Sequence, residues 1–400
     1  MSLETLRAPE DSQGAEYFSL PRDYYLSDDW YQRDLERIFR KRWMFAGHSA
    51  QLSEPRSYIT CEIGDDNVVV VRTDDGEVAA YHNICRHRGS RIAPERCGQL
   101  KGRLVCPYHA WSYDLSDGSL RSVPRKPADF DMSPYGLKPV WVEEWHGMLF
   151  INLAAEEPVS IAERFADLEL GPWRLEETKV IRDSEFLLPV NWKLVAENFL
   201  ECYHCALNHP ELCTVFNPDQ TAVSENRHVS AEGTQRETGN DSSPAVVPDT
   251  DDDYYAFANG SLLREGAVSY TMDGKLKVRK LLGGGEEPLG HAGLFSFPAF
   301  NFTLCPDYIN TLTWKPVSAT ETIFRKTWAV HRDAVEGVDY HTDDVCALLD
   351  ITVQEDRDLT VNSQLGIQSH AYVPGPYNTR FESGIINWMR LYHRIHAGDA

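Results

Sequence analysis

The sequence predicts an α+β protein, with a small antiparallel β domain followed by a larger domain of antiparallel sheet and helices. Short apolar or alternating runs separated by Gly, Asp and Pro turns fill residues 58–152, which is the pattern of half-buried antiparallel strands. A helical apolar period follows at 191–209, strand-like runs occupy 291–332, and a second long helical period covers about 341–365. Strands and helices that are segregated in this way are typical of α+β folds.

The length and pattern of the chain indicate how these elements are divided into domains. At about 100–200 residues per domain, 400 residues suggest two domains or one large one. Amphipathic helices are expected at 28–41 and 385–395, and loops at 236–254 and 283–289. We therefore predict an N-terminal helical segment at 1–40, the small β domain at 41–158 and the larger domain at 159–400.

Charge and hydropathy exclude several classes of partner. The formal net charge of -22 argues against nucleic acid, whose phosphates attract a basic surface. The longest apolar runs, such as Val68–Val71, are far too short to cross a bilayer. The first residues also lack the basic start and apolar core of a signal peptide. We expect a cytoplasmic protein that binds neither nucleic acid nor membrane.

The nine cysteines are better explained as thiols and metal ligands than as a disulfide framework, because their number is odd and no export signal is expected. Two of them stand beside histidines: Cys85 and His87 form C-x-H, and Cys106 and His109 form C-x2-H. Four such ligands on two loops suit either one tetrahedral zinc ion or a two-iron cluster. In the two-iron case, two thiolates hold one iron and two imidazoles hold the other, which raises the reduction potential.

A second set of possible metal ligands lies in the predicted helix at 191–209. Glu201, His204 and His209 form E-x2-H-x4-H. A regular helix turns by about 100° per residue, which places Glu201 and His204 on one face and His209 roughly 140° away from His204. Pro210 disfavours helical backbone at His209, so we expect the helix to end or distort there, which brings the two imidazoles together.

A mononuclear Fe(II) site of the facial-triad type also needs one carboxylate. The candidates are Glu355, Asp356 and Asp358, in the predicted helix at 341–365. Asp356 falls on the buried stripe of that helix, whereas Glu355 and Asp358 lie about 100° and about 200° away from it. A carboxylate on an apolar face is costly without a metal or a salt partner. Asp356 is therefore the preferred ligand, and a buried ion pair is the alternative.

Two longer stretches of sequence resemble a known family. CRHRG and CPYHAW resemble the loops of a Rieske [2Fe–2S] domain, because they join the ligand spacing to the intervening Arg, Gly, Pro and Tyr. Ala110 departs from the Gly that usually follows the last histidine, a change that can perturb loop packing. NWKLVAEN before the second pair of histidines, and EDRDL with Q-x-G after it, are similar to Rieske non-haem iron oxygenase α subunits. The resemblance covers roughly residues 40–366.

This resemblance implies two cofactors, a Rieske [2Fe–2S] cluster and a mononuclear Fe(II). The implied cluster ligands are Cys85, His87, Cys106 and His109, and the implied iron ligands are His204, His209 and Asp356. Glu201 is implied as the bridge to a Rieske histidine of a neighbouring subunit in a homotrimer, and Asn191 stands where members place a residue near the iron. Because the chain has no nucleotide-binding motif, a separate NAD(P)H-dependent reductase with flavin and its own iron–sulfur centre is implied as the electron donor.

The substrate class is suggested by finer similarities. Ring-hydroxylating dioxygenases usually carry Asp at the bridge, whereas this chain has Glu201, as do members that act on quaternary amines. SYTMDGK, DAVEGVDY and AYVPGPY are also similar to stretches of stachydrine and glycine betaine demethylases. The resemblance thus implies a monooxygenase that N-demethylates a betaine and releases formaldehyde. Aromatic faces and negative charge would recognise such a cation, but Phe199 and Tyr203, near the ligands, are expected to pack in the core.

Three other functions are compatible with the sequence. An aromatic-ring-hydroxylating dioxygenase would give a cis-diol and no formaldehyde. A monooxygenase that hydroxylates a carbon of choline or carnitine would share the same motifs. A zinc-stabilised binding protein would be colourless, whereas a Rieske protein is red-brown and contains iron and acid-labile sulfide.

Overall fold

The computed structural model describes residues 15–166, 168–218, 245–246, 255–259 and 263–397. The chain divides into two compact units. The smaller unit contains Phe39–Arg164 and Leu175–Lys179, and the larger unit contains the chain up to Ile38, Phe165–Arg174 and the chain from Val180 onward. The domain boundaries expected near 41 and 159 stay predictions, because the units interleave between Phe165 and Lys179.

The smaller unit is built from short antiparallel strands. They are β1 (Met44–His48), β2 (Ser57–Ile63), β3 (Asp66–Arg72), β4 (Val78–His82), β5 (Cys97–Gln99), β6 (Leu104–Val105), β7 (Ser112–Tyr113), β8 (Leu120–Ser122), β9 (Trp141–Trp145) and β10 (Met148–Asn152). They form sheets in the orders β1–β10–β9, β4–β3–β2–β5 and β6–β7–β8. The run Val68–Val71 lies in the inner strand β3 and is 0% exposed, because both faces of this strand are covered.

The larger unit is organised around a seven-stranded antiparallel sheet with the order β11–β17–β16–β15–β14–β13–β12. Its strands are β11 (Thr178–Leu188), β12 (Ala245–Val246), β13 (Ala256–Asn259), β14 (Ala292–Ser296), β15 (Phe300–Leu304), β16 (Ile309–Ser318) and β17 (Glu321–His331). β16 and β17 form a long hairpin whose register runs from Ile309–Ala329 to Ser318–Glu321. The strands predicted at 291–332 are therefore confirmed.

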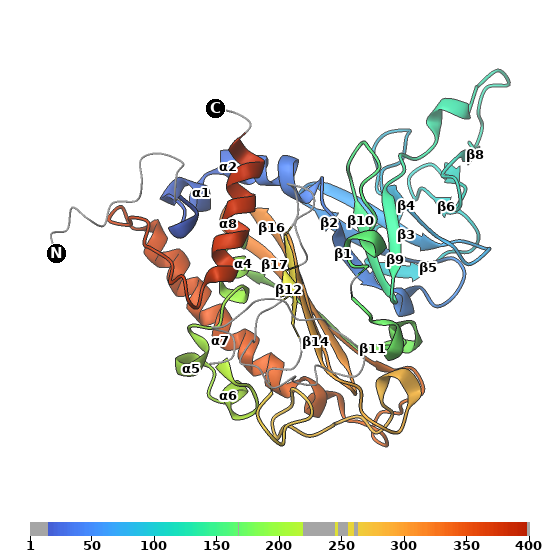
Figure 1. Ribbon diagram of the computed structural model, residues 1–400. Coiled ribbons are helices and arrows are strands. Elements are labelled where there is room, and N and C mark those ends of the chain that lie inside the picture. Colours follow the sequence, from blue (N-terminus) through green and yellow to red (C-terminus); the bar gives the residue numbers. More distant parts are fainter. Residues whose placement is uncertain (1–14, 167, 219–244, 247–254, 260–262, 398–400) are drawn as a thin grey trace. The chain divides into compact units, whose positions relative to one another are not determined.

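Most of the helices are short, and the two long ones, α7 and α8, lie near the C-terminus. The helices of the described residues are α1 (Arg22–Leu26), α2 (Asp28–Asp34), α3 (Ile161–Arg164), α4 (Trp192–Phe199), α5 (Cys205–Asn208), α6 (Leu212–Val215), α7 (Thr342–Gln368) and α8 (Ser383–His396). Figure 1 shows α4, α7 and α8 on one side of the strands of the seven-stranded sheet. The helices predicted at 341–365 and 385–395 are confirmed by α7 and α8. Among the described residues, no helix combines the length and apolar composition that crossing a membrane requires.

Two helix predictions need correction. The helix expected at 28–41 ends as α2 at Asp34 and continues as a π-helical turn at Leu35–Phe39. The single helix expected at 191–209 is wrong over its middle, since a turn separates α4 from α5. The Glu201 carboxylate accepts hydrogen bonds from the backbone N–H groups of Tyr203 and His204. A side chain that binds nearby N–H groups competes with helical bonding, which accounts for the break.

The loop predictions have mixed outcomes. Of the loop expected at 236–254, only Ala245–Val246 falls within the described residues, where it forms strand β12. The loop expected at 283–289 begins inside a short 3-10 turn at Leu282–Gly284 and is otherwise irregular.

Buried polar groups connect three helices of the larger unit. The carboxylate of Asp34 in α2 accepts hydrogen bonds from Lys193 Nζ at 2.6 Å, Trp192 Nε1 at 2.9 Å and Tyr392 Oη at 2.8 Å. Asp34 and Lys193 are both 0% exposed. A charge in the interior needs a partner of this kind, so the pair fixes α2 and α8 against the start of α4, the helix that leads into the candidate metal site.

Candidate metal centres

The two Cys–His loops of the smaller unit share one main-chain pattern. Each cysteine N–H donates to the carbonyl five residues ahead, and each cysteine carbonyl accepts from the N–H four residues ahead. The bonds are Cys85 N to Ser90 O at 2.8 Å, Gly89 N to Cys85 O at 3.0 Å, Cys106 N to Trp111 O at 2.8 Å and Ala110 N to Cys106 O at 3.0 Å. The backbone alone therefore sets both loops to present a cysteine at the start and a histidine near the tip.

The four predicted ligands lie near one another, with the cysteines inside and the histidines outside. Cys85 and Cys106 are each 2% exposed, whereas His87 and His109 are exposed with ring centroids 4.7 Å apart. Burial raises the pKa of the Cys85 thiol, and the neighbouring Cys106 thiol acts in the same direction. Two buried sulfur donors beside two outer imidazole donors fit a cluster whose inner iron is held by thiolates and whose outer iron is held by imidazoles.

Two features of the loops refine the sequence analysis. Ala110, the departure from the usual Gly, has a φ of 57°, so the loop keeps the left-handed backbone that its counterpart Gly89 has with a φ of 74°. Tyr113 was missed by the sequence analysis. Its hydroxyl lies 3.2 Å from Cys85 Sγ and accepts a hydrogen bond of 3.0 Å from the N–H of Arg86. Because the Tyr113 oxygen already accepts a hydrogen bond from Arg86, its own proton can be donated to the Cys85 sulfur.

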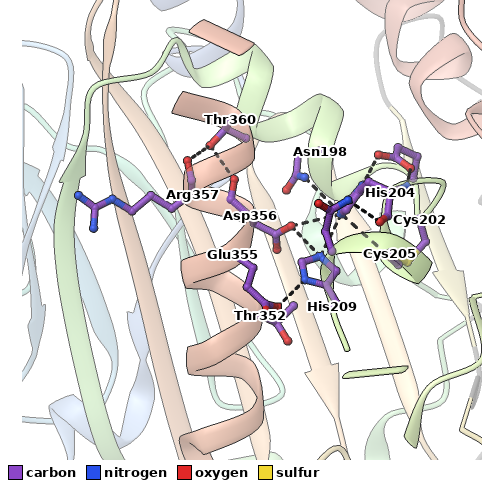
Figure 2. A network of polar contacts seen from close by, with 12 residues as sticks. Asn198, Cys202, His204, Cys205, His209, Thr352, Glu355, Asp356, Arg357 and Thr360 are labelled. Atoms are coloured by element: carbon purple, nitrogen blue, oxygen red, sulfur yellow. Dashed lines mark hydrogen bonds and ion pairs between the residues drawn. A yellow bond between two sulfur atoms is a disulfide. The ribbon is translucent and has the colours of Figure 1, made fainter. Parts of the chain in front are cut away.

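The second constellation comes together in the larger unit. His204 precedes α5 and His209 follows it, while Asp356 projects from α7 (Figure 2). His204 Nε2 and His209 Nε2 are 3.1 Å apart, and Asp356 Oδ1 lies 3.2 Å from the first nitrogen and 3.0 Å from the second. The break in the helix and the non-helical backbone of His209, with a φ of −122° and a ψ of 69°, place both imidazoles on one side, as the Pro210 argument anticipated.

The spacing of these three atoms fits one metal ion. Two ligand atoms at right angles, each about 2.1 Å from a metal, lie about 3.0 Å apart. Asp356 Oδ1 is buried and makes no hydrogen bond of acceptable geometry among the described residues, although both ring nitrogens are close to it. A buried carboxylate oxygen that faces two imidazole nitrogens without hydrogen bonding to them is a donor set for a cation.

The electrostatics of the site agree with this donor set. Burial lowers the pKa of His204, but the carboxylates of Asp356 and Glu201 outweigh it and raise the pKa to about 9. Burial also lowers the pKa of His209, and Asp356 and Glu355 outweigh it in the same way. Burial raises the pKa of Asp356, while the two histidines reverse the effect and lower it. The surroundings thus favour positive charge at the point where the three side chains meet.

The other carboxylates predicted near the iron occupy distinct places. Glu201 Oε1 contacts His204 Nδ1, on the side of the ring away from Asp356. Glu355 Oε2 lies 2.8 Å from His209 Nδ1, so Glu355 faces the histidine and Asp356 faces both rings. Asp358 is exposed and accepts a hydrogen bond from Gln354. The geometry therefore favours Asp356 over both neighbours as the carboxylate ligand.

Asn191, which the family resemblance placed near the iron, instead caps a helix and binds the main chain. Its Oδ1 accepts a hydrogen bond from the N–H of Lys193 and caps α4, and its Nδ2 donates to the carbonyls of Tyr25 at 3.0 Å and Ala319 at 2.7 Å. Its side chain is committed to the main chain, so we no longer assign it to the iron site.

The residues around the broken helix were only partly anticipated. Phe199 stacks on Trp314 and Phe324, as expected for a packing residue. Tyr203 does not pack in the core: it is 55% exposed and stacks on Phe381, because the helix face it was assigned to ends with α4. Cys202 and Cys205 form a disulfide that encloses Tyr203 and His204, so the expectation of thiols is wrong for these two cysteines.

Comparisons with known proteins match this architecture over nearly the whole chain. The family model for the Rieske [2Fe-2S] domain matches residues 42–141, and that for the ring hydroxylating alpha subunit (catalytic domain) matches 169–397. The glycine betaine monooxygenase oxygenase subunit of Pseudomonas aeruginosa is 37% identical over 386 residues, covering 94% of this chain and 88% of that protein. Its namesake from Chromohalobacter salexigens is 35% identical over 390 residues, covering 94% and 85%.

A solved structure shows the same fold. The crystal structure of the quaternary ammonium Rieske monooxygenase CntA with an inhibitor has a TM-score of 0.74 at 22% identity, covering 98% of this chain and 99% of that chain. The predicted α+β architecture is thereby confirmed. The two family matches imply a [2Fe–2S] cluster and a mononuclear non-haem iron. A catalytic-domain match of this extent, with full-length relatives above 30% identity, makes the chain a member of the Rieske non-haem iron oxygenase α subunits, a family of oxidoreductases.

Proposed function

We propose that this oxygenase subunit N-demethylates a quaternary ammonium compound of the glycine betaine or proline betaine type. The observation that carries the proposal is the similarity to glycine betaine monooxygenase oxygenase subunits over 94% of the chain. Hydroxylation of one N-methyl group consumes O2, two electrons and two protons and yields water and an N-hydroxymethyl compound. That compound loses formaldehyde and a proton and leaves the demethylated amine.

The roles proposed for the side chains follow from their places in the two centres. Cys85, His87, Cys106 and His109 would hold the Rieske cluster, and His204, His209 and Asp356 would hold the mononuclear iron. When bound, such an iron with three protein ligands supplies open positions for O2. Glu201 would orient His204 through Nδ1 and connect it to a cluster histidine of a neighbouring subunit, which is the expected path for electrons.

The charge of the site supports a cationic substrate. A quaternary ammonium group has no N–H to donate, so it is bound by negative charge and by aromatic faces. Glu201 contacts His204, Glu355 contacts His209, and Asp356 contacts both histidines. Part of that negative charge would stay uncompensated after a divalent metal binds, which favours a cation over an aromatic acid.

The proposed partners and assembly rest on the family resemblance. A separate NAD(P)H-dependent reductase with flavin and an iron–sulfur centre would deliver the electrons, and a homotrimer would bring the cluster of one subunit to Glu201 of the next. A cytoplasmic location suits this chemistry, because NAD(P)H is available there.

A single turnover tests the proposal. The purified protein is reduced chemically without oxygen and mixed in parallel with glycine betaine, proline betaine, carnitine, choline or an aromatic acid, after which O2 is admitted. We expect formaldehyde with one of the betaines, in step with reoxidation of the cluster colour. Asp356→Ala is the control, since it should keep the cluster colour, lose the mononuclear iron and give no formaldehyde.

The other outcomes distinguish the alternatives. A cis-diol without formaldehyde would indicate a ring-hydroxylating dioxygenase, and a hydroxylated carbon of choline or carnitine would indicate the related monooxygenase. A colourless protein that contains zinc would overturn the proposal. Retained iron in Asp356→Ala would move the ligand assignment to Glu355, which also contacts His209.

A further inference from the structure

Two consecutive residues of α7 contact opposite nitrogens of one imidazole. Asp356 Oδ1 lies 3.0 Å from His209 Nε2, and Glu355 Oε2 lies 2.8 Å from His209 Nδ1. Figure 2 shows Glu355 and Asp356 reaching the ring of His209 from successive positions of the helix. His209 itself is 1% exposed, so both contacts are made in a buried environment. Carboxylates of α7 therefore contact both nitrogens of this ring.

The contact with Glu355 decides which nitrogen of His209 is available to a metal. A carboxylate oxygen only accepts hydrogen bonds, so Nδ1 must carry the proton that it donates to Glu355. In the neutral imidazole, which is the form that binds a metal, the lone pair is then on Nε2, the atom that faces Asp356 and His204. A metal-binding histidine generally needs such a partner on its other nitrogen, which fixes the tautomer and makes the ligand more basic.

His204 has an equivalent arrangement with a different carboxylate. Its Nδ1 contacts Glu201, while its Nε2 faces Asp356. The two carboxylates differ in their other contacts, because Glu201 also accepts hydrogen bonds from the N–H groups of Tyr203 and His204 and so stabilises the turn between α4 and α5. Glu355 projects from the same regular helix as Asp356, and its side chain is 26% exposed.

We propose that Glu355 is a positioning residue for the mononuclear iron: it holds His209 in the metal-binding tautomer and adds negative charge beside the cation. The proposal rests on the assignment of His209 and Asp356 as ligands. It gives Glu355 a role separate from ligation and from electron transfer between subunits, since it supports the histidine that Glu201 does not contact.

Metal binding, measured apart from turnover, tests this role. The full-length protein with its Rieske cluster is freed of mononuclear metal without oxygen, and the dissociation constants of Fe(II) and Co(II) are measured. Glu355→Ala should weaken Fe(II) binding about 10–100-fold, the usual cost of removing a histidine's supporting carboxylate. Glu355→Gln keeps an oxygen that accepts the Nδ1 proton, so it should recover most of the affinity and show an altered Co(II) absorption spectrum. Asp358→Asn, an exposed acid one turn along α7, is the matched control and should bind Fe(II) normally.

The outcomes separate this proposal from the ligand assignment. Normal Fe(II) affinity in Glu355→Ala, together with loss of binding in His209→Ala, would overturn the positioning role and leave the ligands standing. Normal Fe(II) affinity in His209→Ala would overturn both. If Glu355→Ala does not fold, Glu355→Gln decides the question: wild-type affinity with a wild-type Co(II) spectrum would contradict the proposal, because the lost charge would then have no effect on the metal.

Discussion

The hydroxyl of Tyr113 lies 3.2 Å from the sulfur of Cys85 and accepts a hydrogen bond from the backbone N–H of Arg86. A hydrogen bond to a cluster sulfur stabilises the more negative, reduced state and so raises the reduction potential. We expect Tyr113→Phe to lower the Rieske midpoint potential by about 50 mV, the equivalent of about 1 kcal/mol for one electron. Redox titration of the cluster absorbance measures the shift. An unchanged potential in Tyr113→Phe would contradict the assignment.

The backbone at Ala110 allows a test of strain in the cluster loops. A left-handed φ costs a residue with a Cβ about 1–2 kcal/mol, and glycine adopts it readily. Ala110, with a φ of 57°, should therefore gain about 1 kcal/mol of stability when changed to Gly, whereas Gly89→Ala should lose a similar amount. A Cβ built on Gly89 meets no atom within 4 Å, so the second change tests backbone strain without a steric clash. Thermal unfolding followed by cluster colour should shift in opposite directions.

The buried pair of Asp34 and Lys193 predicts a large loss of stability from a single change. Lys193→Met removes the lysine from the buried Asp34 carboxylate, leaving two neutral donors and the His396 imidazole at 3.2 Å, and should cost about 3–5 kcal/mol in the free energy of unfolding. Lys193→Met combined with Asp34→Asn removes the orphaned charge and should recover part of the loss. Denaturant midpoints of both variants measure this difference. A double variant less stable than Lys193→Met would contradict the charge argument.

Glu197 gives the larger unit a pH-dependent stability. Burial raises the pKa of Glu197 from the usual 4.5 to about 7, although the hydrogen bond from Tyr25 and the charge of Lys193 act in the other direction. Between these pH values the unfolded chain has lost a proton that the folded chain keeps, so stability falls as pH rises from about 4.5 to 7 and then levels off. Glu197→Gln should remove this fall and stabilise the protein by at most about 3 kcal/mol at pH 8. Unfolding midpoints at pH 5 and pH 8 measure it, and equal pH dependence in both proteins would disprove the prediction.

Glu201→Gln separates electron transfer from metal binding. Glutamine can keep its one oxygen beside His204 Nδ1 and gives up the acceptor for the N–H groups of Tyr203 and His204; because no predicted ligand changes, the variant should retain both the cluster and the mononuclear iron. The carboxylate charge is lost, and we expect cluster reoxidation in the single-turnover experiment to slow by about 10–100-fold. Iron analysis and the cluster spectrum serve as controls. Normal reoxidation with both metals present would show that Glu201 is not the bridge.

The shape of the loops at the candidate cluster site could be predicted from the sequence because the expected ligands are local. The C-x-H and C-x2-H spacings lie in loops whose shape comes from hydrogen bonds between residues at most five apart, as in Cys85 to Ser90. Asp356 could be selected because its helix is regular and the buried stripe marks one face. The same periodicity did not reveal what Glu355 does, because its partner His209 is 146 residues away.

The remaining features depend on contacts that periodicity does not record. The turn between α4 and α5 follows from the Glu201 side chain binding the next N–H groups, which competes with a pattern that is otherwise helical. Asp34 and Lys193 are 159 residues apart in the sequence, so the helical pattern around Lys193 could not identify Asp34 as its partner. Asn191 was assigned to the iron by resemblance alone, whereas its backbone contacts with Tyr25 and Ala319 define its role.

The two cluster loops keep the same main-chain bonds although their histidines stand two and three residues after the cysteine. Because these bonds use only N–H and C=O groups, the side chains of Arg86, Arg88 and Tyr108 are not needed to form the loops. These exposed side chains instead shape the surface that the loops present, while the main chain holds the ligand positions. One cofactor geometry can thus serve a series of electron donors and acceptors without being rebuilt for each.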